Sequence, residues 1–260
     1  MPRIWFITGS SSGFGRQLAI AVAQNGDKVV ATSRDSTKLD GLRELGIIPT
    51  KLEVHKESDI QAVIRNVEST IDSIDILVNN IGYILEGAIE ECSNEEIIAQ
   101  FDTNLFPQVR VLRVVLTYLR AWKSGVIAKF GSIGGWNAAV AIYTESLAAE
   151  LAPFHIDVTC VEPGYFRTDF LTGGHKNTQQ TRDGLAAYSR RQPGDPVKGA
   201  QVLVEALTKA ARCEGRQLPP RLALGADSLT AIGRSLKREQ EMLDSWWDII
   251  VSTDCDDVRG

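Results

Sequence analysis

The chain has 260 residues, 43% of them hydrophobic and 23% charged, with a formal net charge of −5. This composition supplies enough apolar surface for one large core and is too apolar for a disordered chain. The mild acidity argues against a nucleic-acid-binding protein, which needs a basic patch or stripe. No apolar run approaches the roughly 18 residues that span a membrane. We expect a cytoplasmic protein without nucleic-acid or membrane partners.

The first residues give no sign of export, because Met1–Arg3 leads directly into the apolar run Ile4–Ile7. The four cysteines lie far apart and form no CxxC pair, which predicts neither a zinc site nor a disulfide framework. The three histidines, His55 among them, show no metal-ligand spacing. We therefore expect no metal site and a surface position for each histidine.

Short apolar runs alternate with segments of helical spacing over most of the chain. Strands are predicted over Arg3–Ile7, Lys28–Thr32, Ile47–Leu52, Ile74–Val78, Val126–Phe130, Ile156–Val161 and Arg221–Leu224. Helices are predicted over Phe14–Asn25, Ser58–Asp72, Glu95–Phe101, Val109–Trp122, Gly199–Arg212 and Ser228 to about Trp247. The alternation predicts one α/β domain, residues 1–260, with a doubly wound parallel sheet of about seven strands and helices on both faces.

Two regions stand apart from this pattern. Residues 171–198 are polar and Gly-rich and too long for an ordinary connection, which predicts a lid over a substrate site. The pair Trp246-Trp247 is expected to pack the last helix, with a dimer contact as the alternative.

A glycine-rich turn joins the first strand to the first helix, over Thr8–Gly15. Glycines there let the backbone approach a pyrophosphate, and the helix N-terminus offers free N–H groups and a positive dipole end. At the end of the second strand stands Arg34, where an NAD enzyme has an acidic residue for the ribose 2′-hydroxyl. A guanidinium at this position favours a 2′-phosphate and hence NADP(H); a solvated surface arginine is the alternative.

These motifs and three later ones resemble the short-chain dehydrogenase/reductase family, from Arg3 to about Asp254. The TGxxxGxG motif is Thr8–Gly15, and the NNxG motif is Asn79–Gly82 with Ile81 in the usual Ala position. The PGxxxT motif is Pro163–Thr168. The resemblance implies a Rossmann-like fold, NADP(H) as cofactor, a small-molecule substrate, and a homodimer or homotetramer.

The resemblance also implies a set of cofactor-binding residues. Glu53 stands where the family usually has an Asp near the adenine, and Arg113 matches a basic position in the long helix. The complete set is Thr8, Gly9, Ser11, Ser12, Gly13, Phe14, Gly15, Arg34, Glu53, Asn79, Gly82, Arg113, Pro163, Gly164, Phe166 and Thr168.

At the catalytic end the family pattern breaks. Asn104 matches the helix asparagine, Ser132 the serine that holds the substrate oxygen, and Tyr143 the tyrosine that exchanges a proton with it. The family's lysine should follow the tyrosine by four residues, where this chain has Leu147. We infer a deletion on the order of ten residues, close to three helical turns, which keeps the apolar face of the helix aligned. Leu147 and Leu151 can therefore still pack.

The missing lysine has a chemical consequence. An unassisted tyrosine has a pKa near 10, so it is a poor base for alcohol oxidation but remains an acid for carbonyl reduction. Acid–base assistance accounts for roughly 10²–10⁴-fold in rate, so we expect a weak or reduction-only enzyme. Lys129, three positions before Ser132, could serve instead near the nicotinamide; a paired or snorkelling structural lysine is the expected alternative.

The sequence leaves the function open among several hypotheses. The first is an NADP(H)-dependent oxidoreductase of the short-chain type, acting on a carbonyl or alcohol of a small or medium metabolite. The second is a non-redox derivative, such as a cyclase, isomerase or dehydratase, and the third is a cofactor-binding regulator without catalysis. An error in the coding sequence is a further explanation of the missing block.

Overall fold

A computed structural model of the chain describes residues 1–85, 89–132, 137–171 and 191–252. The strands of the described part are β1 (Ile4–Ile7), β2 (Lys28–Ser33), β3 (Ile48–Lys51), β4 (Ile76–Asn79), β5 (Gly125–Phe130), β6 (Ile156–Pro163) and β7 (Arg221–Leu224). The helices there are α1 (Gly13–Gln24), α2 (Glu57–Thr70), α3 (Asn94–Asn104), α4 (Phe106–Trp122), α5 (Asn137–Leu151), α7 (Pro196–Thr208) and α8 (Ala226–Val251). Short 3₁₀ helices are η1 (Ser36–Leu45), η2 (Ile89–Glu91), η3 (Ala152–Phe154), η4 (Asp169–Leu171) and η5 (Ala211–Cys213).

The strands form one seven-stranded sheet in the order β3-β2-β1-β4-β5-β6-β7, and every pairing is parallel. The order of the strands changes direction between β1 and β4, with β2 and β3 on one side and β5 to β7 on the other. In such sheets, ligands bind beyond the carboxyl ends of the strands at this switch point. The predicted doubly wound fold is confirmed. The predicted glycine turn therefore lies at the place in the fold where a nucleotide binds.

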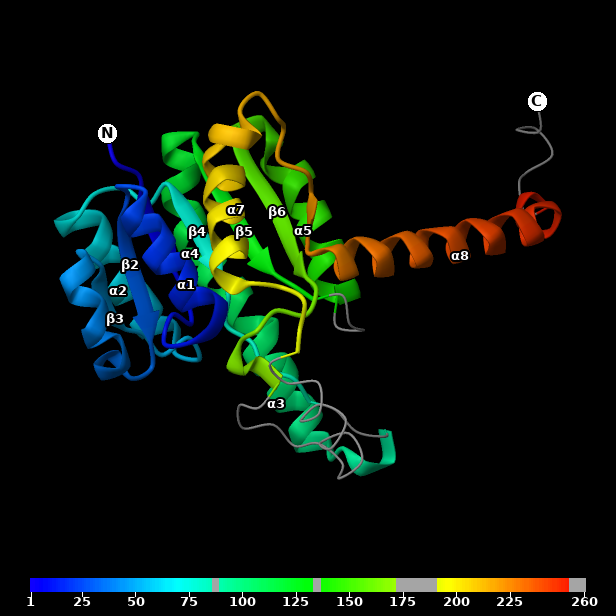
Figure 1. Cartoon of the computed structure of the whole chain (residues 1–260), viewed down its shortest axis with the longest axis horizontal. Helices are drawn as coiled ribbons and strands as arrows, with labels where there is room; N and C mark the ends of the chain where they lie inside the picture. The colour runs from blue at the N-terminus through cyan, green and yellow to red at the C-terminus, as the bar shows by residue number, and fades with distance from the viewer. Residues whose placement is uncertain (86–88, 133–136, 172–190, 253–260) are drawn as a thin grey trace.

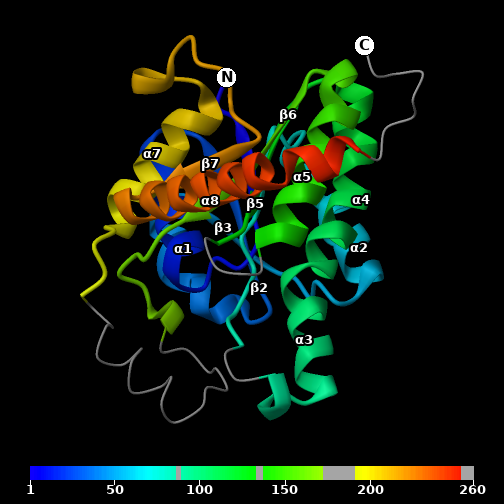
Figure 2. The ribbon, with the colours of Figure 1, turned by 90° about the vertical axis from the view of Figure 1, so that its right-hand side faces the viewer.

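Helices cover both faces of the sheet (Figures 1 and 2). One core cluster joins the sheet to α1, η1 and α7, with buried residues such as Leu18, Leu39 and Leu203. The other joins it to α2, α4 and α5, with Ile64 and Leu112 among its members. β1 is buried at all four positions, as expected of a central strand covered on both faces.

Local signals explain where several helices begin. Ser93 and Glu96 form a reciprocal capping box at the start of α3. Pro107 lies in the first turn of α4, where its missing N–H costs nothing, so α4 begins at Phe106 rather than at the predicted Val109. The Asp195 side chain accepts hydrogen bonds from the first amides of α7. The sequence missed η1, which an Asp35–Thr37 hydrogen bond caps.

Two expectations about the second half of the chain are settled. Leu147 and Leu151 of α5 are buried, which confirms the expectation that both leucines pack. Trp246 and Trp247 are 55% and 66% exposed, so the expectation that they pack the last helix is wrong. α8, which carries both residues, projects away from the body of the molecule (Figure 1). Most of the predicted lid falls on residues 172–190, outside the described residues.

None of the described helices combines the length and apolarity that a membrane crossing requires.

Candidate functional site

The glycine turn is closely packed against the carboxyl end of β4. Gly9 has φ +70°, a conformation that favours glycine. A Cβ on Gly15 would lie 2.5 Å from the carbonyl oxygen of Gly9 and would also overlap the Asn80 amide nitrogen. A side chain at Gly15 therefore does not fit without moving the turn, and one at Gly9 would strain the backbone. The glycines thus let the turn pack closely on itself and on the loop after β4.

Thr8 and Asn80 fasten the turn to β4. The Thr8 hydroxyl accepts a hydrogen bond from the backbone amide of Asn80 at 3.0 Å. The side-chain amide of Asn80 donates to the carbonyl oxygens of Thr8 and Gly9 at 3.2 and 3.0 Å. Asn80 is part of the NNxG motif, but the prediction named Asn79 and Gly82 from it. Asn80 is therefore a positioning residue that sequence reasoning passed over.

α1 begins where this turn ends, and the N-cap side chain does not cap its first backbone amides. Ser12 is the N-cap residue and makes no side-chain capping hydrogen bond. The first-turn N–H groups are therefore not satisfied by the Ser12 hydroxyl, and such groups can bind an anion. The PGxxxT segment comes back to this point, because a Cβ on Gly13 would lie 3.8 Å from Cβ of Thr168. Two predicted cofactor motifs thus meet at the start of one helix.

The end of β2 presents an arginine and an aspartate in succession. Arg34 is exposed directly after β2. The Asp35 carboxylate is engaged with its own loop, accepting hydrogen bonds from the Thr37 amide at 3.1 Å and hydroxyl at 2.7 Å. These bonds lower the pKa of Asp35. The carboxylate is thus held by its own loop, whereas the hydrogen bond from His55 and, less strongly, the exposed Arg34 guanidinium lower the pKa of Glu53.

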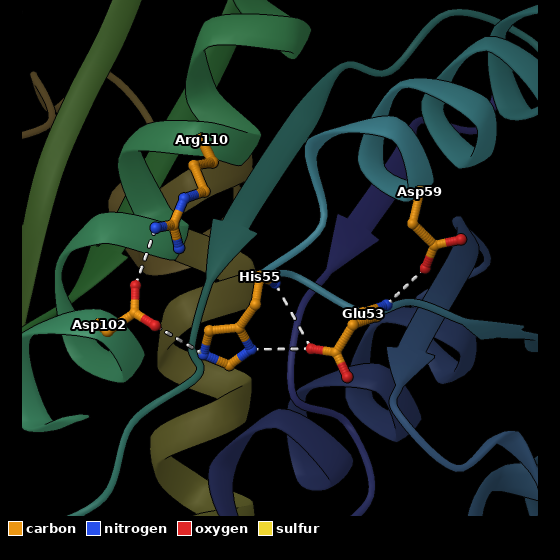
Figure 3. Close-up of polar contacts among 5 residues, drawn as sticks. All are labelled: Glu53, His55, Asp59, Asp102 and Arg110. Atoms are coloured by element: carbon orange, nitrogen blue, oxygen red, sulfur yellow. Dashed lines mark hydrogen bonds and ion pairs between the residues drawn. The ribbon is translucent and has the colours of Figure 1, made fainter.

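Glu53 belongs to a chain of polar contacts that Figure 3 shows. Its carboxylate lies 2.8 Å from Nδ1 of His55, and Nε2 of His55 lies 3.8 Å from Asp102, which pairs with Arg110 at 2.8 Å. The hydrogen bond from His55 lowers the pKa of Glu53. His55 lies in the loop after β3 with its side chain 32% exposed, and the histidine links the end of β3 to α3 and α4.

Two arginines of α4 differ in their relation to this network. Arg110 makes the ion pair with Asp102, whereas the predicted Arg113 is exposed. Sequence reasoning missed Arg110 and Asp102, because only the packing of α3 and α4 against the β3–α2 loop brings them to His55.

Phe14 and Phe166, which belong to the predicted cofactor-binding set, use their side chains for packing. The Phe14 ring lies 5.5 Å from the Phe130 ring and 4.7 Å from the Phe166 ring, in edge-to-face contact with the latter. A Cβ on Gly199 of α7 would come within 2.8 Å of both Phe14 and Phe166. These rings join α1, α7 and the PGxxxT segment. Any role of Phe14 or Phe166 toward a cofactor therefore belongs to the backbone.

Gly164 is held by the root of α8. Its amide donates to the Leu224 carbonyl at 2.8 Å, and a Cβ on Gly164 would overlap the Asp227 carboxylate. Asp227 also accepts from the Tyr165 amide at 2.7 Å. The segment after Pro163 is thereby tied to both β7 and α8.

Asn79 and Asn104 are both engaged in backbone contacts. Asn79 is buried and donates to the Gln108 carbonyl at 3.4 Å. The Asn104 side chain accepts from the Tyr83 amide at 3.0 Å and donates to the Tyr83 carbonyl at 2.7 Å. Next to it, a Cβ on Gly82 would lie 3.5 Å from Asn104 Oδ1. Asn104 therefore fixes the loop after β4.

Lys129 is the unusual residue of the catalytic end. Its side chain is 0% exposed, and its amine has no hydrogen-bond partner among the described residues. Burial lowers the pKa of Lys129 to about 7. The expectation of a paired or snorkelling lysine is wrong, because β5 lies inside the sheet and Lys129 is flanked in register by Asn79 of β4 and Cys160 of β6.

The Lys129 amine lies 3.8 Å from the centroid of the Tyr143 ring. The predicted catalytic tyrosine thus projects from α5 onto the lysine that the sequence considered as a substitute. Burial and, to a lesser extent, the charge of Glu150 raise the pKa of Tyr143. Cys160 stays a thiol, since burial raises its pKa to about 12. Ser132, two residues beyond β5, is partly buried.

No group of three or more His, Cys, Asp and Glu side chains is placed to hold a metal ion within the part of the chain that the structure describes.

A profile of the short chain dehydrogenase family matches residues 3–179. The oxidoreductase BOA17 of Botryotinia fuckeliana is 30% identical, with 97% of this chain and 100% of that protein covered. The Bacillus subtilis oxidoreductase YusZ is 31% identical, over 80% of this chain and 85% of that one. Among solved structures, a short-chain dehydrogenase of Streptomyces avermitilis superposes with a TM-score of 0.87 at 32% identity, covering 98% of this chain and 99% of that one. The chain is an enzyme of the short-chain dehydrogenase/reductase family.

Proposed function

We propose that the protein is an NADP(H)-dependent oxidoreductase that reduces a carbonyl group of a small or medium-sized metabolite. The observation that carries this proposal is the glycine turn, which leaves the first amides of α1 uncapped at the switch point of the sheet. A solved serine dehydrogenase of the same fold, described as complexed with NADP+, is 26% identical with a TM-score of 0.74 and supports it.

The end of β2 favours NADP(H) over NAD(H). Arg34 is exposed there and can pair with a 2′-phosphate, whereas Asp35 is engaged by Thr37 and is poorly placed to accept from a ribose 2′-hydroxyl. The first-turn amides of α1, together with Ser11, Ser12 and Thr168, would hold the pyrophosphate of the cofactor. NADPH supplies the hydride when it is bound.

Tyr143 acts as the proton donor to the substrate oxygen, and Ser132 holds that oxygen. The raised pKa of Tyr143 keeps its hydroxyl protonated at neutral pH. A protonated tyrosine donates a hydrogen to a carbonyl but is a poor base for an alcohol, so reduction is the favoured direction. Asn104 acts in this scheme by holding the loop after β4 through both of its Tyr83 hydrogen bonds.

Lys129 takes the place of the missing lysine as the cation beside the tyrosine. Its pKa of about 7 means that a large share of the molecules carry an ammonium there at neutral pH. The negative charge that develops on Tyr143 as it donates its proton is stabilised by that ammonium. Reduction should therefore slow as the pH rises above about 7 and Lys129 loses its proton.

Cofactor choice is tested by measuring NADPH and NADH affinity for the wild-type chain and Arg34→Ala. We expect Arg34→Ala to weaken NADPH roughly 10–100-fold, the effect of a hydrogen bond to a charged group, and to leave NADH unchanged. Arg43→Ala is the matched control, because Arg43 is an exposed arginine of η1 paired with Asp40. Equal loss of both cofactors would contradict the assignment of Arg34.

Chemistry is tested by following NADPH consumption with a panel of aldehydes and ketones. Tyr143→Phe should lower kcat by about 10²–10⁴-fold while NADPH affinity stays unchanged. A protein that binds NADPH but turns over no carbonyl would overturn the reductase proposal. Product formed without transfer of deuterium from labelled NADPH would favour a non-redox reaction instead.

A further inference from the structure

α8 carries an apolar row that no other element of the described chain covers. All of α8 lies within the described residues, and Ser228 is the one side chain of it that is fully buried. Figure 1 shows the helix projecting away from the rest of the molecule. Leu229, Leu236, Leu243 and Ile250 recur every seven residues and are 69%, 60%, 45% and 43% exposed. Such a row is the seam of a helix that packs lengthwise on another helix.

Further apolar side chains widen the row. Ile232 and Trp246 each follow a member of the row by three residues, as the second seam position of a heptad does. Met242, Trp247 and Ile249 flank it and are 49%, 66% and 54% exposed. Glu239 occupies the same heptad position as Ile232 and Trp246 and is the polar residue of the three. The four tryptophans of two chains alone can bury several hundred Å², and the aliphatic row extends this toward the roughly 1,200 Å² of a small specific interface.

The charges of α8 are divided along its length. Basic residues occupy the first half beyond Asp227, at Arg234, Lys237 and Arg238. Acidic residues occupy the second half, at Glu239, Glu241, Asp244 and Asp248. This arrangement opposes the helix dipole, which favours acidic residues near the N-terminus and basic ones near the C-terminus. An isolated α8 gains nothing from it, whereas a partner helix of reversed direction offsets it.

We propose that α8 pairs with α8 of a second copy of this chain in an antiparallel helix pair. Antiparallel pairing sets the basic half of each helix beside the acidic half of the other, while parallel pairing sets like charges together. The register that best sets the basic half of each helix beside the acidic half of the other also brings Leu236 beside Leu243 of the second copy. It brings Leu229 beside Ile250 of the second copy. The apolar row and the charge pattern thus select the same partner.

The root of α8 holds the helix in a fixed direction. The Ser228 hydroxyl donates to the Glu162 carbonyl at 2.8 Å, and Asp227 accepts from the Tyr165 and Ser228 amides at 2.7 and 3.0 Å. Glu162 itself is buried and pairs with Arg221 through a bidentate ion pair. α8 is therefore an arm fastened to the end of β6, next to the PGxxxT segment. This proposal does not depend on the proposed function.

The test is sedimentation equilibrium of the full chain over a range of concentrations. We expect a dimer for the wild type and a monomer for Leu243→Glu/Trp246→Glu, with unchanged circular dichroism because both residues are exposed. Ser245→Glu is the control, since it adds a glutamate to the same part of α8 at an exposed position outside the row and should stay dimeric. A wild type that is monomeric at every concentration, or a double variant that remains dimeric, would overturn the proposal.

Orientation is tested by reversing charges. Arg234→Glu/Lys237→Glu/Arg238→Glu should weaken the dimer about tenfold or more, and adding Glu241→Lys/Asp244→Lys/Asp248→Lys should restore it. In a parallel dimer the second set restores nothing, because each residue faces its own copy. Added salt should weaken the wild-type dimer by screening attraction. A dimer that salt strengthens, or that the six substitutions fail to restore, would refute the antiparallel arrangement.

Discussion

The carboxyl ends of β1 and β4 differ in character from that of β5. Around the glycine turn, Thr8 and Asn80 bond to each other and to the turn, so the backbone is held in one arrangement. At β5, the Lys129 amine is buried beside a tyrosine ring with no hydrogen bond among the described residues. The first region has the polar groups of Thr8 and Asn80 satisfied and its backbone held by hydrogen bonds. The second retains a costly ionisable group, as sites of chemistry often do.

The largest expected effect tests the rigidity of the glycine turn. Gly15→Ala places a Cβ 2.5 Å from the Gly9 carbonyl oxygen, so the turn must move away from the cofactor. We expect NADPH affinity to fall by about 100-fold or more, on the order of 3 kcal/mol, in a fluorescence titration. Gly41→Ala is the control, because its Cβ meets only Arg16 at 3.8 Å. Unchanged affinity would mean that the turn is not a fixed cradle.

The next effect tests the strain at β5. Lys129→Met should raise stability by roughly 2–4 kcal/mol at about pH 6, because it removes a buried amine. The folded pKa of Lys129 is lowered to about 7, so the folded state binds fewer protons than the unfolded state between about pH 7 and 10. Wild-type stability therefore rises with pH across that window, and the advantage of Lys129→Met shrinks.

Chemical denaturation at several pH values measures this difference. The same variant should lower kcat by removing the cation beside Tyr143. A Lys129→Met protein that is less stable than the wild type at about pH 6 would show that the amine is well accommodated, and the contrast between the two regions would disappear.

The smallest effect concerns the edge of the cofactor region. Glu53→Gln should cost about 0.5–1 kcal/mol at neutral pH, since it weakens the hydrogen bond with partly exposed His55. The folded pKa of Glu53 is lowered, so its contribution is present above the unfolded value of about 4.3 and is lost as pH falls through the folded value.

Thermal unfolding of the two proteins as a function of pH checks this, with exposed Glu44→Gln as a control that should change little at any pH. A difference between Glu53→Gln and the wild type that persists unchanged in acid would exclude the carboxylate of Glu53 as its source.

Much of the fold could be predicted from the sequence because its signals are local. Buried strands such as β1 and β4 are short apolar runs, and their alternation with amphipathic helices leaves few topologies. An apolar pattern does not fix a helix boundary where a cap or a proline decides it, as at Pro107 of α4. The exposed Trp246 and Trp247 show a further limit: an apolar pattern identifies the face of a helix but not what covers it.

The sequence by itself determined the family, the glycine turn, Arg34 at the end of β2 and the absence of a lysine four residues after Tyr143, because each is fixed by residue type and spacing. Tertiary structure alone decided that Lys129 lies over Tyr143, that His55 reaches Asp102, and that α8 projects with its apolar row uncovered. The first two are contacts between different elements of the fold, and the third is the absence of such contacts along a described helix. They depend on how sheet and helices pack, which no local pattern encodes.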